Sequence, residues 1–281
     1  MKKYIINGLF LFSALSSMLF TSCYKKFDTK SYQPEFTING FTSSSAIGDG
    51  SLVGYWAFEG SYIDSVSKTA GTGVSTSFTP GIVGQSLQGV NNGYVLSDLT
   101  DGIKNLSSFT VDFWINNPMP AGVFSPFCVA GTDVGWQGIL NFYFDNNTSN
   151  SSNFKLHYTD DQTTPNEQWL TLGALSNPWN SWVNIAVTYN ATSSTFNLYQ
   201  GGTLVLSQTI SGLGNLVLPA TASNIIFGAL PSETTPPVGT DTAPQDWQGF
   251  LTGQLDEVRV YNKALTQTEL QALIILQGKG K

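Results

Sequence analysis

The feature that most constrains this chain is a series of short runs, from residue 52 onward, in which apolar and polar residues alternate. Successive side chains of a strand point to opposite faces, so this period of two predicts strands that bury one face. Gly, Asn, Ser and Pro clusters between the runs supply the turns of an all-β sandwich. The best-defined strands are residues 109–116, 138–145, 154–158, 168–172, 182–189 and 195–199.

In each run, every second residue is apolar, and these residues share one face of the strand. They predict the core between two sheets. Charged residues make up 11% of the chain and aromatic residues 13%, a composition that suits a wide, aromatic-rich core. The predicted core residues are Phe109, Val111, Phe113, Ile115, Leu140, Phe142, Phe144, Phe154, Leu156, Tyr158, Leu170, Leu172, Val183, Ile185, Val187 and Tyr189.

A short C-terminal helix is expected after the last strand. Thr266 and Glu269 have the spacing of a capping box, and Leu265 and Leu270 that of a hydrophobic staple. We expect the helix to end near Gly278.

The N-terminus carries an export signal. Lys2 and Lys3 precede an uncharged, predominantly apolar run that is too short for a stable membrane span. The run ends in Thr21-Ser22-Cys23 and resembles the lipobox of bacterial lipoproteins, although Phe20 stands where Leu is usual. The resemblance implies acylation at Cys23 and an exported, membrane-anchored lipoprotein, which we assign to the outer membrane. An ordinary secretory signal with an incidental cysteine is the alternative.

These signals divide the chain into three parts. Residues 1–22 form the predicted lipoprotein signal peptide. Residues 23–50 have no sustained apolar periodicity and are interpreted as a flexible stalk. Residues 51–281 form one β-sandwich domain, since such folds exceed about 200 residues as single domains.

The charge of the chain argues against nucleic acid as a partner, and its cysteines argue against a disulfide. The net charge is −7, and the single arginine, Arg259, stands in no basic cluster, so nucleic acid is not expected as a partner. Cys128 lies in the apolar run Pro126-Phe127-Cys128-Val129 and is predicted to be a buried, reduced thiol rather than a disulfide partner of Cys23.

Several stretches, taken in order, carry a family resemblance. They are residues 52–60, 78–87, 109–115, 182–189 and 253–265. Over residues 52–277 the chain resembles the laminin-G-like domains of the concanavalin-A-like lectin/glucanase superfamily. The resemblance implies a two-sheet antiparallel, jelly-roll-like sandwich. It says less about function, because the fold hosts lectins, adhesion modules, hydrolases and lyases.

Catalysis is not predicted. The glucanases of this superfamily carry an E-x-D-x-x-E pattern, and no Glu-x-Asp occurs in this sequence. Retaining glycosidases need two carboxylates about 5–5.5 Å apart. Asp256 and Glu257 are adjacent on a predicted strand and therefore point to opposite faces. A catalytic triad would have to use His157, the only histidine, and a lone histidine on a strand is more often a binding or surface residue.

A structural calcium ion is implied by the resemblance, because many members hold one where the first and last strands meet. The matching positions are Glu59, Asp64 and Asp256, and carboxylates with backbone carbonyls are ligands that Ca²⁺ accepts. Alternatively, Asp64 caps a turn and Asp256 pairs with Arg259 or a backbone amide.

The parity opposite the core is rich in aromatic and amide side chains. Sugars present apolar C–H faces and hydroxyls, so their sites combine flat rings with hydrogen-bonding groups. The alternative is that Trp114 and Trp169 lie under loops 116–136 and 228–248 as a second core layer. Loop residues Trp136, Trp179 and Trp247 are further candidates. The predicted ligand-binding residues are Trp114, Asn141, Tyr143, His157 and Trp169.

Together these features predict a non-catalytic, laminin-G-like module that binds extracellular carbohydrate. A protein–protein adhesion or structural module on the same fold is the alternative, and an atypical glycan-cleaving enzyme is the third interpretation.

Overall fold

The computed structural model describes residues 35–161 and 166–281. The described residues from Thr37 to Lys281 form one compact unit. The predicted signal peptide and Cys23 lie outside the described residues. Within the described ranges, no helix is both long and apolar enough to cross a membrane.

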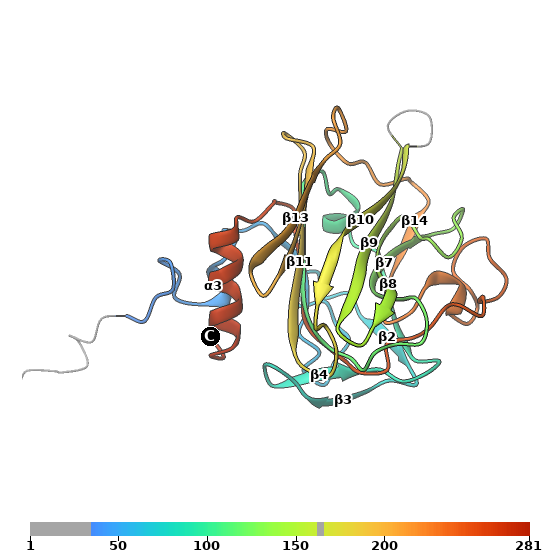
Figure 1. Ribbon diagram of the computed structural model, residues 1–281, viewed down its shortest axis with the longest axis horizontal. Helices are drawn as coiled ribbons and strands as arrows, with labels where there is room; N and C mark the ends of the chain where they lie inside the picture. Colours follow the sequence, from blue (N-terminus) through green and yellow to red (C-terminus); the bar gives the residue numbers. More distant parts are fainter. Residues whose placement is uncertain (1–34, 162–165) are drawn as a thin grey trace, which may run out of the picture. The chain divides into compact units, whose positions relative to one another are not determined.

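The unit Thr37–Lys281 consists of two antiparallel sheets packed face to face (Figure 1). Sheet I has eight strands in the order β13-β12-β11-β6-β15-β4-β3, with β1 paired to β15. Sheet II has seven strands in the order β10-β9-β8-β7-β14-β5-β2. The predicted all-β, jelly-roll-like sandwich is thereby confirmed.

The elements follow one another along the chain with these bounds: η2 (Ser44–Ala46), β1 (Leu52–Trp56), β2 (Gly71–Val74), β3 (Ser77–Pro80), β4 (Gln85–Gln88), β5 (Tyr94–Asp98), α2 (Asp101–Lys104), β6 (Phe109–Asn116), β7 (Phe124–Gly131), β8 (Leu140–Thr148), β9 (Ser151–Asp160), β10 (Asn166–Ser176), β11 (Val183–Asn190), β12 (Thr195–Gln200), β13 (Thr203–Thr209), β14 (Ala222–Phe227), η3 (Pro231–Glu233), β15 (Gln254–Tyr261) and α3 (Gln267–Gln277).

The main core lies between the two sheets and consists of the parity that the sequence predicts. Phe109 of β6 contacts Phe142 of β8 across the sheets, with 6.1 Å between ring centroids. Phe154 of β9 lies against Phe113 of β6 in the same way. All predicted core residues belong to this cluster, Val183 at its partly buried margin.

Helix α3 covers the outer face of sheet I (Figure 1). Its predicted capping box is confirmed: the Glu269 main-chain N–H donates to Thr266 Oγ1, and the Thr266 N–H donates to a Glu269 carboxylate oxygen. Leu270 and Leu273 of the helix are buried together with Tyr261 of β15. The helix ends at its C-cap Gly278, as predicted.

The segment before β1 belongs to the same compact unit. Ile47 is buried in the cluster under α3, and the Ser44 N–H donates to the carbonyl of Lys281 at 3.0 Å. The guanidinium of Arg259 donates to the Ser44 carbonyl. The domain boundary predicted at residue 51 therefore falls inside the unit, which begins at Thr37.

A third, smaller cluster covers part of the outer face of sheet II. The connection from β14 to β15 folds back so that Ala229 packs against Tyr94 of β5 and Cys128 of β7. Cys128 is buried and unpaired, as predicted, and burial raises the pKa of its thiol. The covering connection occupies the β5–β14–β7 side of the sheet, next to strands β8, β9 and β10.

Candidate functional site

Strand register places the predicted polar and aromatic residues of sheet II in rows. Asn141 of β8 faces His157 of β9, and His157 faces Trp169 of β10. Tyr143 lies two positions further along β8, on the same face. Their neighbours along the strands are core residues, so these side chains point to the outer face. The structure thus gathers Asn141, Tyr143, His157 and Trp169 on one surface.

Five rings form a connected group on this surface, called the aromatic platform below. The ring of Trp169 lies 4.2 Å from that of His157 and 5.6 Å from that of Trp136, measured between centroids. Trp136 also contacts the ring of Trp247 at 4.7 Å and that of Tyr143 at 6.3 Å. Trp169 and Trp247 remain 47% and 41% exposed.

Two connections hold the loop tryptophans in place. Trp136 lies between β7 and β8, and its main-chain N–H donates to Asp241 Oδ2 at 2.7 Å. Asp241 and Trp247 both belong to the connection before β15, and the Thr240 N–H donates to the Val134 carbonyl. The sequence marks both tryptophans as candidates, but no local pattern shows that the two loops meet.

His157 lies beneath Trp169 and is fully buried. Its Nε2 is 2.8 Å from Oε1 of Glu167, whose side chain is 44% exposed. Burial lowers the pKa of His157, and the carboxylate of Glu167 partly opposes that shift. The imidazole and carboxylate therefore form a fixed polar pair at the base of the platform.

Asn141 is also fully buried, and neither atom of its amide group has a hydrogen-bond partner among the described residues. Buried amides nearly always have partners, so such a group is uncommon in a core. Because the Asn141 side chain is fully buried, its amide lies beneath the surface and is not accessible to a ligand in this conformation.

Tyr143 is 5% exposed beneath Trp136. Burial raises the pKa of its phenol to about 12, and the nearby carboxylate of Asp145 adds to the shift. Asp145 forms a 2.5 Å salt bridge with Lys155, the residue that faces Tyr143 on β9. The phenol is therefore a neutral donor or acceptor at ordinary pH.

Trp114 is not part of the platform. It lies on β6 of sheet I, where its Nε1 donates to Oε1 of Gln277 at 2.9 Å. This corrects its assignment to the same binding surface: Trp114 is half-buried on the other sheet and is bonded to the last residue of α3. Trp179 is also structural, because it is 6% exposed and its Nε1 donates to the Thr148 carbonyl.

The expected calcium ligands are engaged by other donors. Asp64 accepts hydrogen bonds from the main-chain N–H groups of Tyr55, Val66 and Ser67. Asp256 accepts from those of Ile82, Val83 and Glu257, and Glu59 accepts from that of Gln85. These bonds match the alternative in which Asp64 caps a turn and Asp256 pairs with backbone amides. Among the described residues there is no cluster of three or more His, Cys, Asp or Glu able to hold a metal, and a calcium ion bound partly by backbone carbonyls stays a prediction.

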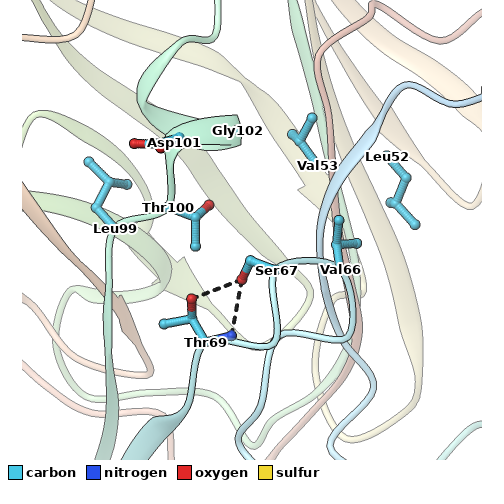
Figure 2. Close-up of a pocket in the computed structure, with 9 residues that line it drawn as sticks. All are labelled: Leu52, Val53, Val66, Ser67, Thr69, Leu99, Thr100, Asp101 and Gly102. Atoms are coloured by element: carbon cyan, nitrogen blue, oxygen red, sulfur yellow. Dashed lines mark hydrogen bonds between the residues drawn. The ribbon is translucent and has the colours of Figure 1, made fainter.

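A cavity of about 460 Å³ lies elsewhere, between β1, the turn after Asp64 and the start of α2 (Figure 2). Ser67 and Thr69 are hydrogen-bonded to each other within it. No aromatic ring lines the cavity, so it lacks a flat surface for ring stacking. Its lining residues are Leu52, Val53, Val66, Ser67, Thr69, Leu99, Thr100, Asp101 and Gly102.

The family model of the concanavalin A-like lectin/glucanases superfamily matches residues 88–271. The chain belongs to this superfamily, which confirms the resemblance seen in the sequence. A comparison with curated proteins gives no significant match.

Several solved structures of toxins are similar to this chain in fold. A botulinum neurotoxin type C structure, described as depending on two ganglioside molecules for cell entry, has a TM-score of 0.58 at 15% identity over 84% of this chain and 53% of that one. The binding domain of Paraclostridial Mosquitocidal Protein 1 gives 0.57 at 18% identity over 80% and 52%. The serotype D neurotoxin domain in complex with N-acetylneuraminic acid gives 0.55 at 13% identity over 83% and 52%. The chain spans about half the length of these structures, and the likeness shows the fold.

Proposed function

We propose that this protein is a non-catalytic carbohydrate-binding module whose aromatic platform stacks on sugar rings. The observation that carries the proposal is the convergence of Trp136, Trp169 and Trp247 from three separate segments on one outer sheet face. Folding leaves Trp169 and Trp247 more than 40% exposed, at 47% and 41%. Large aromatic groups held on a surface are typical of recognition sites.

The groups around the platform supply the polar half of a sugar site. Glu167 offers exposed carboxylate oxygens, and the Lys155–Asp145 pair lies in the next row of the sheet. Flat rings that contact C–H faces, next to groups that bond hydroxyls, are the combination a sugar requires.

The fold comparisons support a carbohydrate partner in general. The type C and serotype D neurotoxin domains are described with gangliosides and with N-acetylneuraminic acid. Because identity to them is only 15% and 13%, their ligands are not transferred to this chain.

Binding without cleavage is favoured because the two carboxylates that contact platform residues already have structural partners. Glu167 bonds His157, and Asp241 holds the main chain of Trp136. A glycosidase needs two carboxyl groups flanking the bond to be broken, one of them free to donate a proton. The superfamily includes glucanases, so hydrolysis of any glycan that binds is a direct check on this proposal.

We also propose that the module is displayed on a membrane through acylation of Cys23, with residues 24–36 as the tether to the folded unit. Cys23→Ser is expected to move the protein from the membrane fraction to the soluble fraction. Continued membrane fractionation of that variant would refute the anchor.

A glycan array probed with the full chain tests the binding proposal. We expect a defined group of glycans to bind, and the double variant Trp169→Ala/Trp247→Ala to lose most of that signal because it removes both exposed rings. Leu204→Ala is the matched control, since it truncates a side chain that is 44% exposed on β13 of the other sheet. Absence of binding to any glycan, or equal binding by the double variant, would overturn the proposal.

A further inference from the structure

The charges around the aromatic platform are predominantly of one sign. Asp246 is exposed and directly precedes Trp247, and Asp133 is exposed on the connection that carries Trp136. Glu167 lies beside His157 with its side chain 44% exposed. Asp241 contacts the main chain of Trp136 from the other loop. Four carboxylates thus belong to the segments that build the platform.

Positive charge at the platform is limited and already compensated. Lys155 is the one basic residue on β7 to β10 or on the β14–β15 connection within the described chain, and its Nζ is 2.5 Å from Asp145 Oδ2. The salt bridge neutralises it. The remaining basic residues of the described chain lie in other segments: Lys68, Lys104, Arg259, Lys263, Lys279 and Lys281.

If a sugar ring stacked on Trp169, its substituents would lie in the negative electrostatic field of these carboxylates. The screening length is roughly 8 Å at physiological ionic strength, so a carboxylate or sulfate on that sugar would feel the surrounding carboxylates. Repulsion between like charges across an interface lowers the affinity for a ligand of the same sign, and this contributes specificity. An uncharged sugar has no such repulsion and still gains from ring stacking.

We infer that the platform selects uncharged glycans and excludes those that carry a carboxylate or sulfate on the stacked residue. This inference rests on the proposed function and specifies its substrate class. The exclusion comes from the carboxylates of Asp133, Asp241, Asp246 and Glu167, and the described parts of the segments that build the platform hold no unpaired lysine or arginine.

The test uses pairs of oligosaccharides that differ only in a terminal sialic acid or a sulfate group, measured with the full chain. At about 20 mM salt the neutral member is expected to bind at least about tenfold more tightly. The ratio should shrink at about 150 mM salt, because the screening length falls as salt rises. An unchanged ratio would contradict an electrostatic origin.

A variant pair locates the effect. Asp133→Asn/Asp246→Asn removes two rim charges, and it should strengthen binding of the acidic members several-fold while leaving the neutral members unchanged. Asp101→Asn is the control, because Asp101 is exposed at the start of α2, lines the separate cavity and should change neither. Equal melting temperatures would show that all variants are folded.

The outcomes separate the two claims. If acidic members bind as well as or better than neutral members, charge selection is overturned while carbohydrate binding stands. If no member of any pair binds, the proposed function itself fails, and the inference fails with it.

Discussion

The outer faces of the two sheets each carry a tryptophan among polar side chains, but their surroundings differ. On sheet I, α3 covers a group of polar side chains around Glu257, and its last residue is bonded to Trp114. On sheet II, Trp169 stays 47% exposed beside a loop that covers only the neighbouring strands. The outward tryptophan of sheet I, Trp114, therefore has a structural partner, whereas that of sheet II, Trp169, is accessible to a ligand.

The covered face of sheet I holds a buried polar network. Glu257 accepts hydrogen bonds from Tyr55, Arg259 and Gln277 at 2.6, 2.8 and 3.0 Å. The guanidinium of Arg259 also lies 4.4 Å from the centroid of the Tyr55 ring. Glu257 has a φ of +54°, in the left-handed region, at an irregularity in the pairing of β15 with β6. This network explains how charged residues are accommodated on the covered face of sheet I, because each charge has a partner.

The largest effect expected from this comparison is on the stability of sheet I. Trp114→Ala should cost about 2–3 kcal/mol of unfolding free energy, because it removes a half-buried ring and the bond to Gln277 at the end of α3. Chemical denaturation of the variant measures this loss. A cost below about 1 kcal/mol would mean that α3 does not depend on this contact.

The next effect is a pH dependence that comes from Asp112, which faces the same network. Burial raises the pKa of Asp112 from 3.8 to about 7, opposed by a hydrogen bond from Asn184 and by the charge of Arg259, and reinforced by the charge of Glu257. The folded state therefore binds this proton more tightly than the unfolded chain does. The stabilisation is complete below the unfolded pKa and is lost as pH rises through about 7.

Asp112→Asn keeps an oxygen for the Asn184 amide and removes the charge. The variant should be more stable than the wild type at pH 8 by on the order of 2 kcal/mol, with the difference vanishing near pH 4. Thermal melts of both proteins across this range measure the slope. If the melting temperatures of the two proteins changed with pH in the same way, the pH dependence would not come from Asp112.

The smallest effect is expected at the seam where β1 meets β15. Because Asp64 and Asp256 are engaged by main-chain N–H groups, a chelator should shift the melting temperature by no more than about 1 °C. Asp256→Ala should nonetheless destabilise the protein with or without calcium, since it leaves the N–H groups of Ile82 and Val83 without their acceptor. A loss of several degrees on chelation would instead establish the calcium site that the family resemblance implies.

The sequence predicts the core well because the alternation in β6, β8, β9 and β11 is regular, and a period of two leaves one choice of buried face. It also predicts α3, since capping residues and the staple are local signals. These features depend on neighbours along the chain.

The candidate site is only partly predictable for the same reason. The alternation that places Trp169 outward also places Trp114 outward, and nothing local to either strand states which sheet α3 covers. The contacts of Trp136 with Trp247 join residues far apart in the chain through two irregular connections. The start of the folded unit at Thr37 was likewise hidden, because Ile47 is held by contacts with α3 rather than by a local pattern.

The most direct test of the account is Trp169→Ala, measured for binding and for stability in the same protein. Titration calorimetry with a glycan identified on the array should show a loss of about 1–2 kcal/mol in binding free energy, roughly 5- to 30-fold in affinity. Its unfolding free energy should change by less than about 1 kcal/mol, because the ring is 47% exposed. Full affinity in the variant, or a stability loss as large as that of Trp114→Ala, would contradict a binding role for the platform.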